Sequence, residues 1–264
     1  MRLTFLGTGT SFGVPVVGCD CARCASTDPR DRRTRHGALL DGADGTLLID
    51  TPPELRLQLL RAGTRRVDAI WFTHGHADHT HGIDDLRALN VGGMGPLPAF
   101  ANADGAAMLR ERFGYIFGDS EEPRGRARPW VNLNTIDDAA PRRIAGHVVA
   151  PLSLPHGDME TMGFRVGGLG YVPDAQEVPA EIVRALRGVD TLVLCALWYG
   201  KPHPAHLNIE RAVNVAADVG ARITYLTHLT HRVGHADLCE RLPGWVRPAH
   251  DGLVVSIDPP SEDQ

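Results

Sequence analysis

The chain has 264 residues, of which 43% are hydrophobic and 22% charged, a composition that excludes disorder as the main state. Its net charge of −5 gives no sign of the basic face that nucleic-acid-binding proteins carry, so we expect no nucleic-acid partner. The longest apolar runs, such as residues 191–197, are too short to cross a bilayer, and we expect no membrane partner.

The N-terminal residues and the cysteines indicate a reducing compartment. The first residues lack the apolar segment and the small-residue cleavage site of a secretory signal. The five cysteines are an odd number, and Cys19, Cys21 and Cys24 are crowded together, which argues against a disulfide framework. We therefore expect a cytoplasmic protein.

The first half of the chain alternates predicted strands with helices. A short apolar strand over 3–6 ends in the glycine-rich stretch GTGTSFG, and residues 38–40 and 46–49 are predicted to form a hairpin. Leucine spacing predicts a helix over 54–62, and the apolar run DAIWFT over 68–73 is predicted to be a buried strand.

The second half of the chain repeats this alternation. Residues 114–134 have weak periodicity, and we expect them to form a surface excursion. The remaining predictions are helices over 104–113, 179–186 and 209–219, buried strands over 192–196 and 223–226, and a frayed tail over 259–264. Because no linker divides the chain, we predict one α/β domain over residues 1–264.

The sequence THGHADH, which begins at Thr73, carries the strongest chemical signal. In an extended segment alternate side chains point the same way, so His74 and His76 can share one ion. A turn after them lets Asp78 and His79 face a neighbouring position. Three imidazoles and a carboxylate suit a borderline ion such as zinc, or manganese where the carboxylate share is high.

Three further residues, His156, Asp174 and His228, each follow a predicted strand. Taken singly, each would be an ordinary surface residue. Functional loops gather at strand ends, however, and together with the THGHADH cluster these residues supply enough ligands for two metal shells.

These residues resemble the metallo-β-lactamase superfamily, whose signature is His-x-His-x-Asp-His. The resemblance covers nearly the whole chain and implies a four-layer αβ/βα sandwich with a dinuclear metal site at one edge. One departure is Ala175, because relatives usually have Thr or Ser after the bridging aspartate. The resemblance implies two metal positions that share one carboxylate, with His74, His76 and His156 at the first, Asp78, His79 and His228 at the second, and Asp174 at both.

The cysteine motif is a second candidate metal site. The thiolates of Cys19, Cys21 and Cys24 need one more ligand to complete a tetrahedron, and the candidate is His231, three residues after His228. A closed Cys₃His site has no open position, so it would hold a structural zinc that joins two loops. Free thiols or a redox site are the alternatives.

The cysteine motif makes the chain similar to the branch that contains phosphoribosyl 1,2-cyclic phosphate phosphodiesterase. This likeness implies a phosphodiesterase that hydrolyses a small, cyclic substrate with a hydroxide activated by two zinc or manganese ions, and it makes Asp78 catalytic as well as a ligand. A histidine between 202 and 208 acts in that branch as a general acid or phosphate contact. His203 and His206 both qualify, and helix capping by this segment is the alternative.

Other contacts and functions stay open. We expect Asp50 to orient a ligand histidine, and Arg33 or Arg35 to contact the substrate phosphate, although a short charged run is more often a solvated face. A thioester or lactone hydrolase and a tRNA 3′-processing enzyme are alternatives on the same scaffold. So is a non-catalytic metal-holding carrier like the pyrroloquinoline quinone biosynthesis protein B, which has a similar cysteine motif. Relatives often form homodimers.

Overall fold

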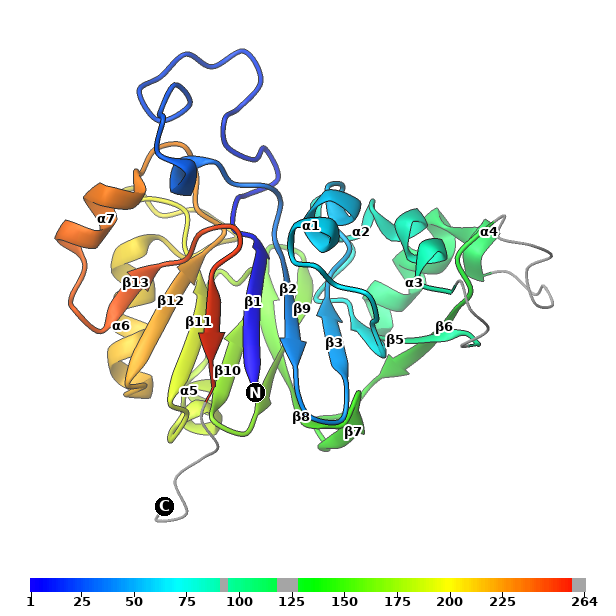
Figure 1. Ribbon diagram of the computed structural model, residues 1–264. Coiled ribbons are helices and arrows are strands. Elements are labelled where there is room, and N and C mark those ends of the chain that lie inside the picture. Colours follow the sequence, from blue (N-terminus) through cyan, green and yellow to red (C-terminus); the bar gives the residue numbers. More distant parts are fainter. Residues whose placement is uncertain (91–94, 118–127, 258–264) are drawn as a thin grey trace.

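The computed structural model describes residues 1–90, 95–117 and 128–257, and within them two seven-stranded sheets pack face to face (Figure 1). The first sheet has the order β14-β1-β2-β3-β4-β5-β6 and consists of β1 (Arg2–Gly7), β2 (Gly37–Asp41), β3 (Thr46–Ile49), β4 (Ala69–Trp71), β5 (Leu97–Asn102), β6 (Val131–Ile136) and β14 (Val254–Ser256). The second sheet has the order β13-β12-β11-β10-β9-β8-β7 and consists of β7 (Arg142–Ile144), β8 (His147–His156), β9 (Met159–Val166), β10 (Leu169–Val172), β11 (Thr191–Cys195), β12 (Ile223–Thr227) and β13 (Val246–Pro248).

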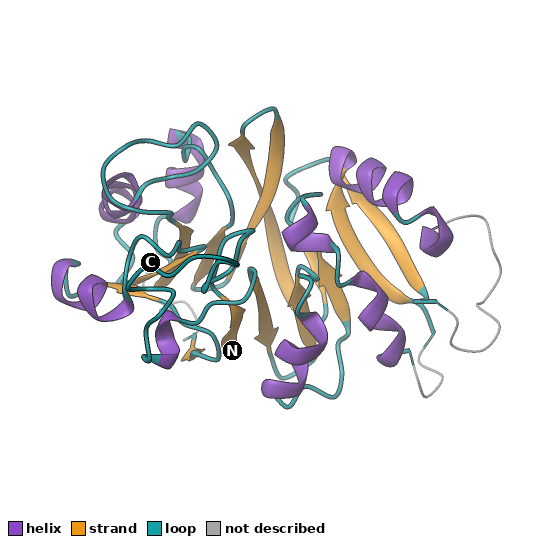
Figure 2. Ribbon diagram, turned by 90° about the horizontal axis from the view of Figure 1, so that it is seen from above, coloured by secondary structure: helices purple, strands orange, loops and turns teal. Residues whose placement is uncertain are grey.

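Helices cover the outer faces of both sheets (Figure 2). None of the helices in the described residues is long and apolar enough to cross a membrane. On the first sheet lie α1 (Leu55–Arg61), the 3-10 helix η2 (Ile83–Ala88), α3 (Ala103–Arg112) and α4 (Gly114–Phe117); on the second lie α5 (Ala180–Leu186), α6 (Ile209–Val219) and α7 (His235–Arg241); α2 (Ala77–Thr80) and the 3-10 helix η1 (Pro29–Asp31) lie in loops.

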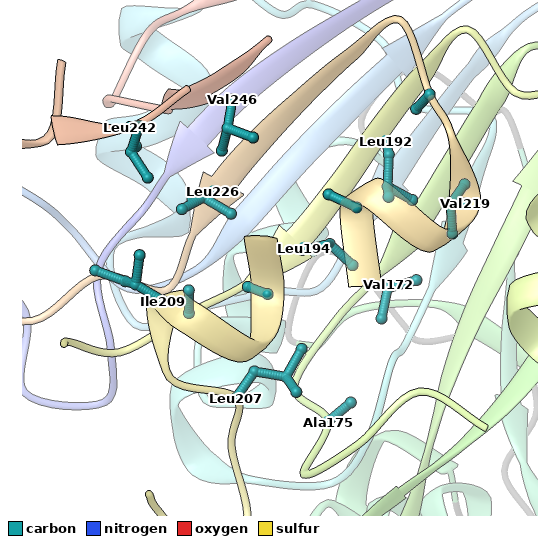
Figure 3. Close-up of a cluster of buried hydrophobic side chains, with 14 of the residues drawn as sticks. Val172, Ala175, Leu192, Leu194, Leu207, Ile209, Val219, Leu226, Leu242 and Val246 are labelled. Atoms are coloured by element: carbon teal, nitrogen blue, oxygen red, sulfur yellow. The ribbon is translucent and has the colours of Figure 1, made fainter. Parts of the chain in front are cut away.

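The alternation of side chains along each strand explains why the sheets are covered on both faces. On β11, Leu192 and Leu194 face the helices and pack with Ile209 and Val219 of α6 (Figure 3). Val193, between the two leucines, points the opposite way into the layer between the sheets. Such continuously apolar strands are typical of sheets buried on both faces.

The layer between the sheets is built from large apolar side chains. Trp71 of β4 meets Phe164 of β9 edge to face at 5.5 Å, and its Nε1 donates to the carbonyl of Met162 at 2.8 Å. Phe164 in turn stacks on Tyr171 of β10 at 5.1 Å. Helices, sheet, sheet and helices thus form the four-layer αβ/βα sandwich, and the fold expected from the resemblance is confirmed.

Segment 114–134 differs from the expected excursion at both of its ends. It begins with α4, and from Val131 it forms β6, which pairs in parallel with β5. β6 is an edge strand, and only its first four residues lie within 114–134. Their alternation of apolar Val131 and Leu133 with Asn132 and Asn134 is too short to stand out in a segment of weak periodicity. Residues 118–127 of the expected excursion, and the expected frayed tail over 259–264, lie outside the described residues.

The topology brings several strand ends to one edge of the molecule. Strands β10, β11 and β12 are parallel, and β8 runs in the same direction because β9 is antiparallel to both β8 and β10. At the same edge the first sheet meets the second, since the Met162 amide donates to the Thr73 carbonyl at 2.7 Å. Loops that follow β4, β8, β10 and β12 are therefore neighbours in space.

Candidate metal centre

Both sheets contribute side chains to one buried cluster at this edge. From the first sheet, the loop after β4 carries His74 and His76, and His76 also occupies the N-cap position of α2. The first turn of α2 carries Asp78 and His79. The second sheet supplies the last residue of β8, a residue just past β10 and the first residue after β12, which are His156, Asp174 and His228.

His74, His76 and His156 form the first group. His76 Nδ1 lies 2.9 Å from His74 Nε2 and 3.4 Å from His156 Nε2. One ligand atom from each residue lies within 4.8 Å of the other two, which is close enough for a single ion to contact all three. The structure thus brings together the three histidines that the resemblance assigns to one metal.

Asp78, His79 and His228 form the second group, and Asp174 lies between the groups. Asp78 Oδ2 is 3.5 Å from His79 Nε2 and 3.7 Å from His228 Nε2. Asp174 Oδ2 lies 3.4 Å from His79 Nε2 and 3.2 Å from His228 Nε2. It is also 3.9 Å from His74 Nε2, so this one carboxylate reaches both groups.

The cluster leaves buried polar atoms without hydrogen-bond partners in the part of the chain that the structure describes. These atoms are His79 Nε2, His228 Nε2 and Asp174 Oδ1, among others. A buried polar atom without a partner is costly, and such atoms are rare in folded proteins. Imidazole nitrogens and carboxylate oxygens that converge in this way fit a divalent cation.

The charges in the cluster also favour a cation. Burial acts to lower the pKa of His79, but the carboxylates of Asp78, Asp50 and Asp174 outweigh it and hold that pKa well above its ordinary value. Burial acts to raise the pKa of Asp174, but His228, His206 and His79 outweigh it and hold that pKa well below its usual range. The pKa of Asp78 is also lowered, so the carboxylates of Asp78 and Asp174 stay ionised and attract positive charge.

Asp50 orients His79. It lies just after β3, and its carboxylate accepts from the amide of Thr73 at 2.7 Å and from the Thr73 hydroxyl at 2.8 Å. The same carboxylate lies 2.7 Å from His79 Nδ1, so Nδ1 keeps a proton and Nε2 is the nitrogen that is available to a cation. Asp50 and His228 have φ of 62° and 59°, and such strained backbone in non-glycine residues concentrates at functional sites.

His36 lies beneath the cluster and was missed by the sequence analysis. Its Nε2 is 2.7 Å from the Tyr171 hydroxyl, and its Nδ1 is 3.3 Å from the Thr227 hydroxyl. Its ring is fully buried beside those of His79 and His228, with centroid distances of 5.4 and 6.1 Å. No motif singles out His36 in the sequence, because only the tertiary structure brings β2, β10 and β12 to it.

His206 and His203 take inner and outer positions beside the cluster. The His206 ring stacks on His228 at 5.0 Å, and its Nδ1 is 3.8 Å from Asp174 Oδ2. The centroid of the His203 ring lies 5.0 Å from that of His206, and His203 Nδ1 accepts from the Ala205 amide at 3.2 Å. The capping alternative is also present, since an Asn208 oxygen caps α6.

The cysteine motif and His231 also come together. His231 Nδ1 lies 3.4 Å from Cys19 Sγ, 3.4 Å from Cys21 Sγ and 3.5 Å from Cys24 Sγ. A hydrogen bond from the Cys24 amide is the main reason that the pKa of the Cys21 thiol falls to about 6, which favours the thiolate form that binds metal. Three thiols around one imidazole fit the closed tetrahedral site that the spacing predicts.

The two arginines expected at the substrate phosphate differ in their surroundings. Arg33 is only 2% exposed, and its guanidinium donates to the Thr8 hydroxyl at 2.8 Å and to the Ala249 carbonyl at 2.7 Å. This placement corrects the expectation for Arg33, because a buried guanidinium is closed to substrate. Arg35 is paired with Glu54 and donates to the Ser11 carbonyl, and its phosphate contact stays a prediction.

Comparison with known proteins agrees with this geometry. A family model described as a beta-lactamase superfamily domain matches residues 46–229. A crystal structure of a diphosphatase from the PhnP family is 37% identical and covers 99% of each chain, with a TM-score of 0.89.

Two further relatives carry different activities in their names. An octanoyltransferase of Porphyromonas gingivalis is 35% identical over 98% of this chain, and the chain spans 52% of that protein, about half of its length. A ribonuclease Z of Myxococcus xanthus is 25% identical over 97% of this chain and 98% of its own length.

Proposed function

This chain belongs to the metallo-β-lactamase superfamily, in its PhnP-like branch, and we propose that it is a metal-dependent phosphodiesterase acting on a small, cyclic phosphodiester. One observation carries the proposal. Seven potential ligands converge around Asp174, and an eighth residue, His206, stacks on His228 and also lies within ligand distance of His156 and Asp174. A hydrolytic centre with an adjacent proton donor suits ester cleavage.

The proposed cofactors are two divalent metals, zinc or manganese, held by the two groups, and a structural zinc in the Cys₃His cluster. When bound, the two ions supply a hydrolytic nucleophile at neutral pH and offset negative charge on phosphoryl oxygens. Asp50 fixes the tautomer of His79 through their 2.7 Å contact. His36 supports the rings of His79 and His228 from below.

His206 is the proposed proton donor to the leaving oxygen. Burial lowers the pKa of its imidazole to about 3, so this role requires that the negative charge of a bound phosphodiester raise that pKa. A general acid must lie within reach of the reacting group, and His206 is the inner of the two histidines, 3.8 Å from Asp174. His203, one ring further from the cluster, then contacts the more distant part of the substrate. The proposed partner is a small molecule rather than nucleic acid, in a protein that acts in the cytoplasm and forms a homodimer.

The activities named for the relatives supply the alternatives. Because this chain spans only about half of the octanoyltransferase, we do not propose octanoyl transfer for it. The ribonuclease Z matches over its full length at lower identity, so tRNA 3′ processing is the alternative to include in an assay. The name of the PhnP-family structure, a diphosphatase, supports chemistry at phosphorus.

The test is turnover by protein loaded with zinc or with manganese. The panel contains bis(p-nitrophenyl) phosphate, a 2′,3′-cyclic nucleotide, a dinucleoside diphosphate, a thioester, a lactone and a precursor tRNA, with Asp78→Ala as control. We expect hydrolysis of the phosphodiesters that disappears in Asp78→Ala. Turnover confined to another member of the panel would replace the proposal, and silence across the panel with full metal content would favour a carrier.

A leaving-group comparison tests the role of His206. Nitrophenolate leaves without a proton, whereas the sugar alkoxide of a cyclic nucleotide needs one. We expect His206→Ala to lower turnover of the cyclic nucleotide about 10²- to 10⁴-fold and to affect the nitrophenyl ester much less. Equal losses on both substrates would contradict a general-acid role and point to metal binding by His206.

A further inference from the structure

The buried side chain of His36 connects the two sheets beneath the second group of ligands. His36 directly precedes β2 of the first sheet and is 1% exposed. Its hydrogen-bond partners are the hydroxyls of Tyr171 on β10 and Thr227 on β12, both in the second sheet. Tyr171 is itself held by Phe164, on which it stacks with an interplanar angle of 1°. The His36 ring is therefore fixed at both of its nitrogens.

One ligand histidine lacks the contact that usually orients such residues. A metal-binding histidine is generally held by a hydrogen bond at the ring nitrogen that does not bind the metal. His79 Nδ1 lies 2.7 Å from the Asp50 carboxylate, and His156 Nδ1 lies 2.7 Å from the Ala205 carbonyl oxygen. His228 Nδ1 is buried and has no hydrogen-bond partner in the part of the chain that the structure describes. The orientation of His228 must therefore come from its backbone and from the rings around it.

His36 acts on both the backbone and the ring of His228. The φ of 59° at His228 is strained for a residue other than glycine, and such a conformation persists only where its surroundings hold it. Thr227, which directly precedes His228, lies with its hydroxyl 3.3 Å from His36 Nδ1. The His36 ring also meets the His228 ring edge to face, with an interplanar angle of 63°.

The first group of ligands has no corresponding contact. Within the described residues, the hydrogen bonds and ring contacts of His36 do not include His74, His76 or His156. Loss of the His36 side chain should therefore disturb the second group and leave the geometry of the first group in place.

We propose that His36 is a positioning residue for His228 and thereby sets the metal affinity of the second group, separately from that of the first. The inference rests on the proposed function, because it concerns one of the two metal positions of the same centre. The hydrogen bond from His36 to Thr227 holds the strained backbone, and the ring contact holds the imidazole of His228.

The experiment measures the two metal positions separately in protein loaded with manganese. Manganese is suitable because thiolates select zinc, and because two neighbouring manganese ions give a spin-coupled electron paramagnetic resonance spectrum that an isolated ion does not give. Metal content and spectrum are recorded after dialysis at a series of free manganese concentrations. We expect wild type to bind two ions with a coupled spectrum. His36→Ala should bind the second ion about 10- to 100-fold more weakly and give the spectrum of an isolated ion over that range.

Two conservative variants separate the two hydrogen bonds of His36. The amide of His36→Asn takes the place of Nδ1 and can keep the contact with Thr227, whereas the amide of His36→Gln lies near the place of Nε2 and can keep the contact with Tyr171. We expect His36→Asn to restore more of the affinity for the second ion than His36→Gln does. Thr227→Val removes the hydroxyl with little change of volume, so it should reproduce the loss seen in His36→Ala and decides the question if that protein does not fold.

His147→Ala is the matched control. His147 is also a buried histidine, but it is the first residue of β8, whereas His156 is the last. We expect His147→Ala to keep both ions, whatever its effect on stability.

The outcomes distinguish this inference from the proposed function, because metal binding is read without turnover. Wild-type affinity for both ions in His36→Ala and in Thr227→Val would overturn the inference, as would equal weakening of both positions. Better retention of the second ion by His36→Gln than by His36→Asn would overturn the role of Thr227. The expected pattern of metal binding in a protein that hydrolyses no phosphodiester would support the inference and contradict the proposed function alone.

Discussion

Asp50 shows how one residue sets the chemistry of its neighbours. It combines a left-handed backbone with a carboxylate that binds Thr73 and His79. Asparagine keeps the shape and tolerates a positive φ, but it loses the negative charge that holds the proton on His79 Nδ1. The residue is thus better tested by asparagine than by alanine, which would add backbone strain.

We expect Asp50→Asn to weaken metal binding about 10- to 100-fold. The readout is the metal that remains per chain after dialysis against a series of chelators. Asp41→Asn is the control, because Asp41 binds Thr46 at the far end of β2. Unchanged metal retention in Asp50→Asn would show that His79 does not depend on this contact.

His235 gives a prediction about pH. Burial, reinforced by the charges of Arg33 and Arg30, lowers the pKa of His235 to about 4. Between about pH 6.5 and pH 4 the unfolded chain binds a proton here that the folded chain does not, so stability falls as the pH falls.

Replacement of His235 by glutamine should flatten that part of the stability profile. One group contributes a slope of at most about 1.4 kcal/mol per pH unit. Urea unfolding across this pH range measures the free energy of unfolding of wild type and of His235→Gln. In the difference between the two proteins, the contributions of all other titratable groups cancel. Parallel profiles would mean that His235 has the same pKa in the folded and the unfolded chain.

At the scale of elements, the centre depends on how closely neighbouring strands, and the loops that follow them, approach one another. Gly7 ends β1, and a Cβ there would lie 1.9 Å from the Arg35 carbonyl oxygen and 2.5 Å from Gln58 Nε2. The carbonyl belongs to the backbone that leads into β2, so it cannot turn aside. Glycine is required here for close approach.

We expect Gly7→Ala to destabilise the protein by about 2–4 kcal/mol. Gly244→Ala is the control, since a Cβ at Gly244 meets no atom within 4 Å, and its effect should stay within about 0.5 kcal/mol. Chemical denaturation measures both. Equal stability of the two variants would show that β1 and β2 separate at little cost.

At the scale of the whole molecule, the ligands come from both sheets, so the centre exists only while the sheets stay packed. Trp71 joins them through Phe164 and through its hydrogen bond to Met162. Trp71 is also the last residue of β4, three residues before His74, which is the first ligand in the loop that follows. Loss of this contact should therefore affect both stability and metal binding.

We expect Trp71→Ala to lower the free energy of unfolding by about 3–5 kcal/mol. The control is Leu60→Ala on α1, where the side chain is 63% exposed and the effect should be within about 0.5 kcal/mol. Unfolding and metal content are measured together. Wild-type stability of Trp71→Ala would mean that neighbouring side chains move to fill the cavity that the substitution leaves between the sheets.

The sequence by itself determined the fold family and the residues that gather at the centre. THGHADH is a local pattern of spacing, and His156, Asp174 and His228 each follow a predicted strand. Such patterns can be recognised in the sequence before the fold is known. The cysteine motif is also a local pattern. Its pairing with His231, 212 residues after Cys19, was predicted from the place of His231 three residues after His228 and from the resemblance to a known family.

Only the tertiary structure decided what depends on contacts between distant segments. It buried Arg33, placed His36 under the cluster, and ordered His206 inside His203. It also brought Arg232 onto Trp198, although these residues lie on different loops. Burial and orientation arise from the packing of the two sheets and their loops, and no spacing along the chain encodes them.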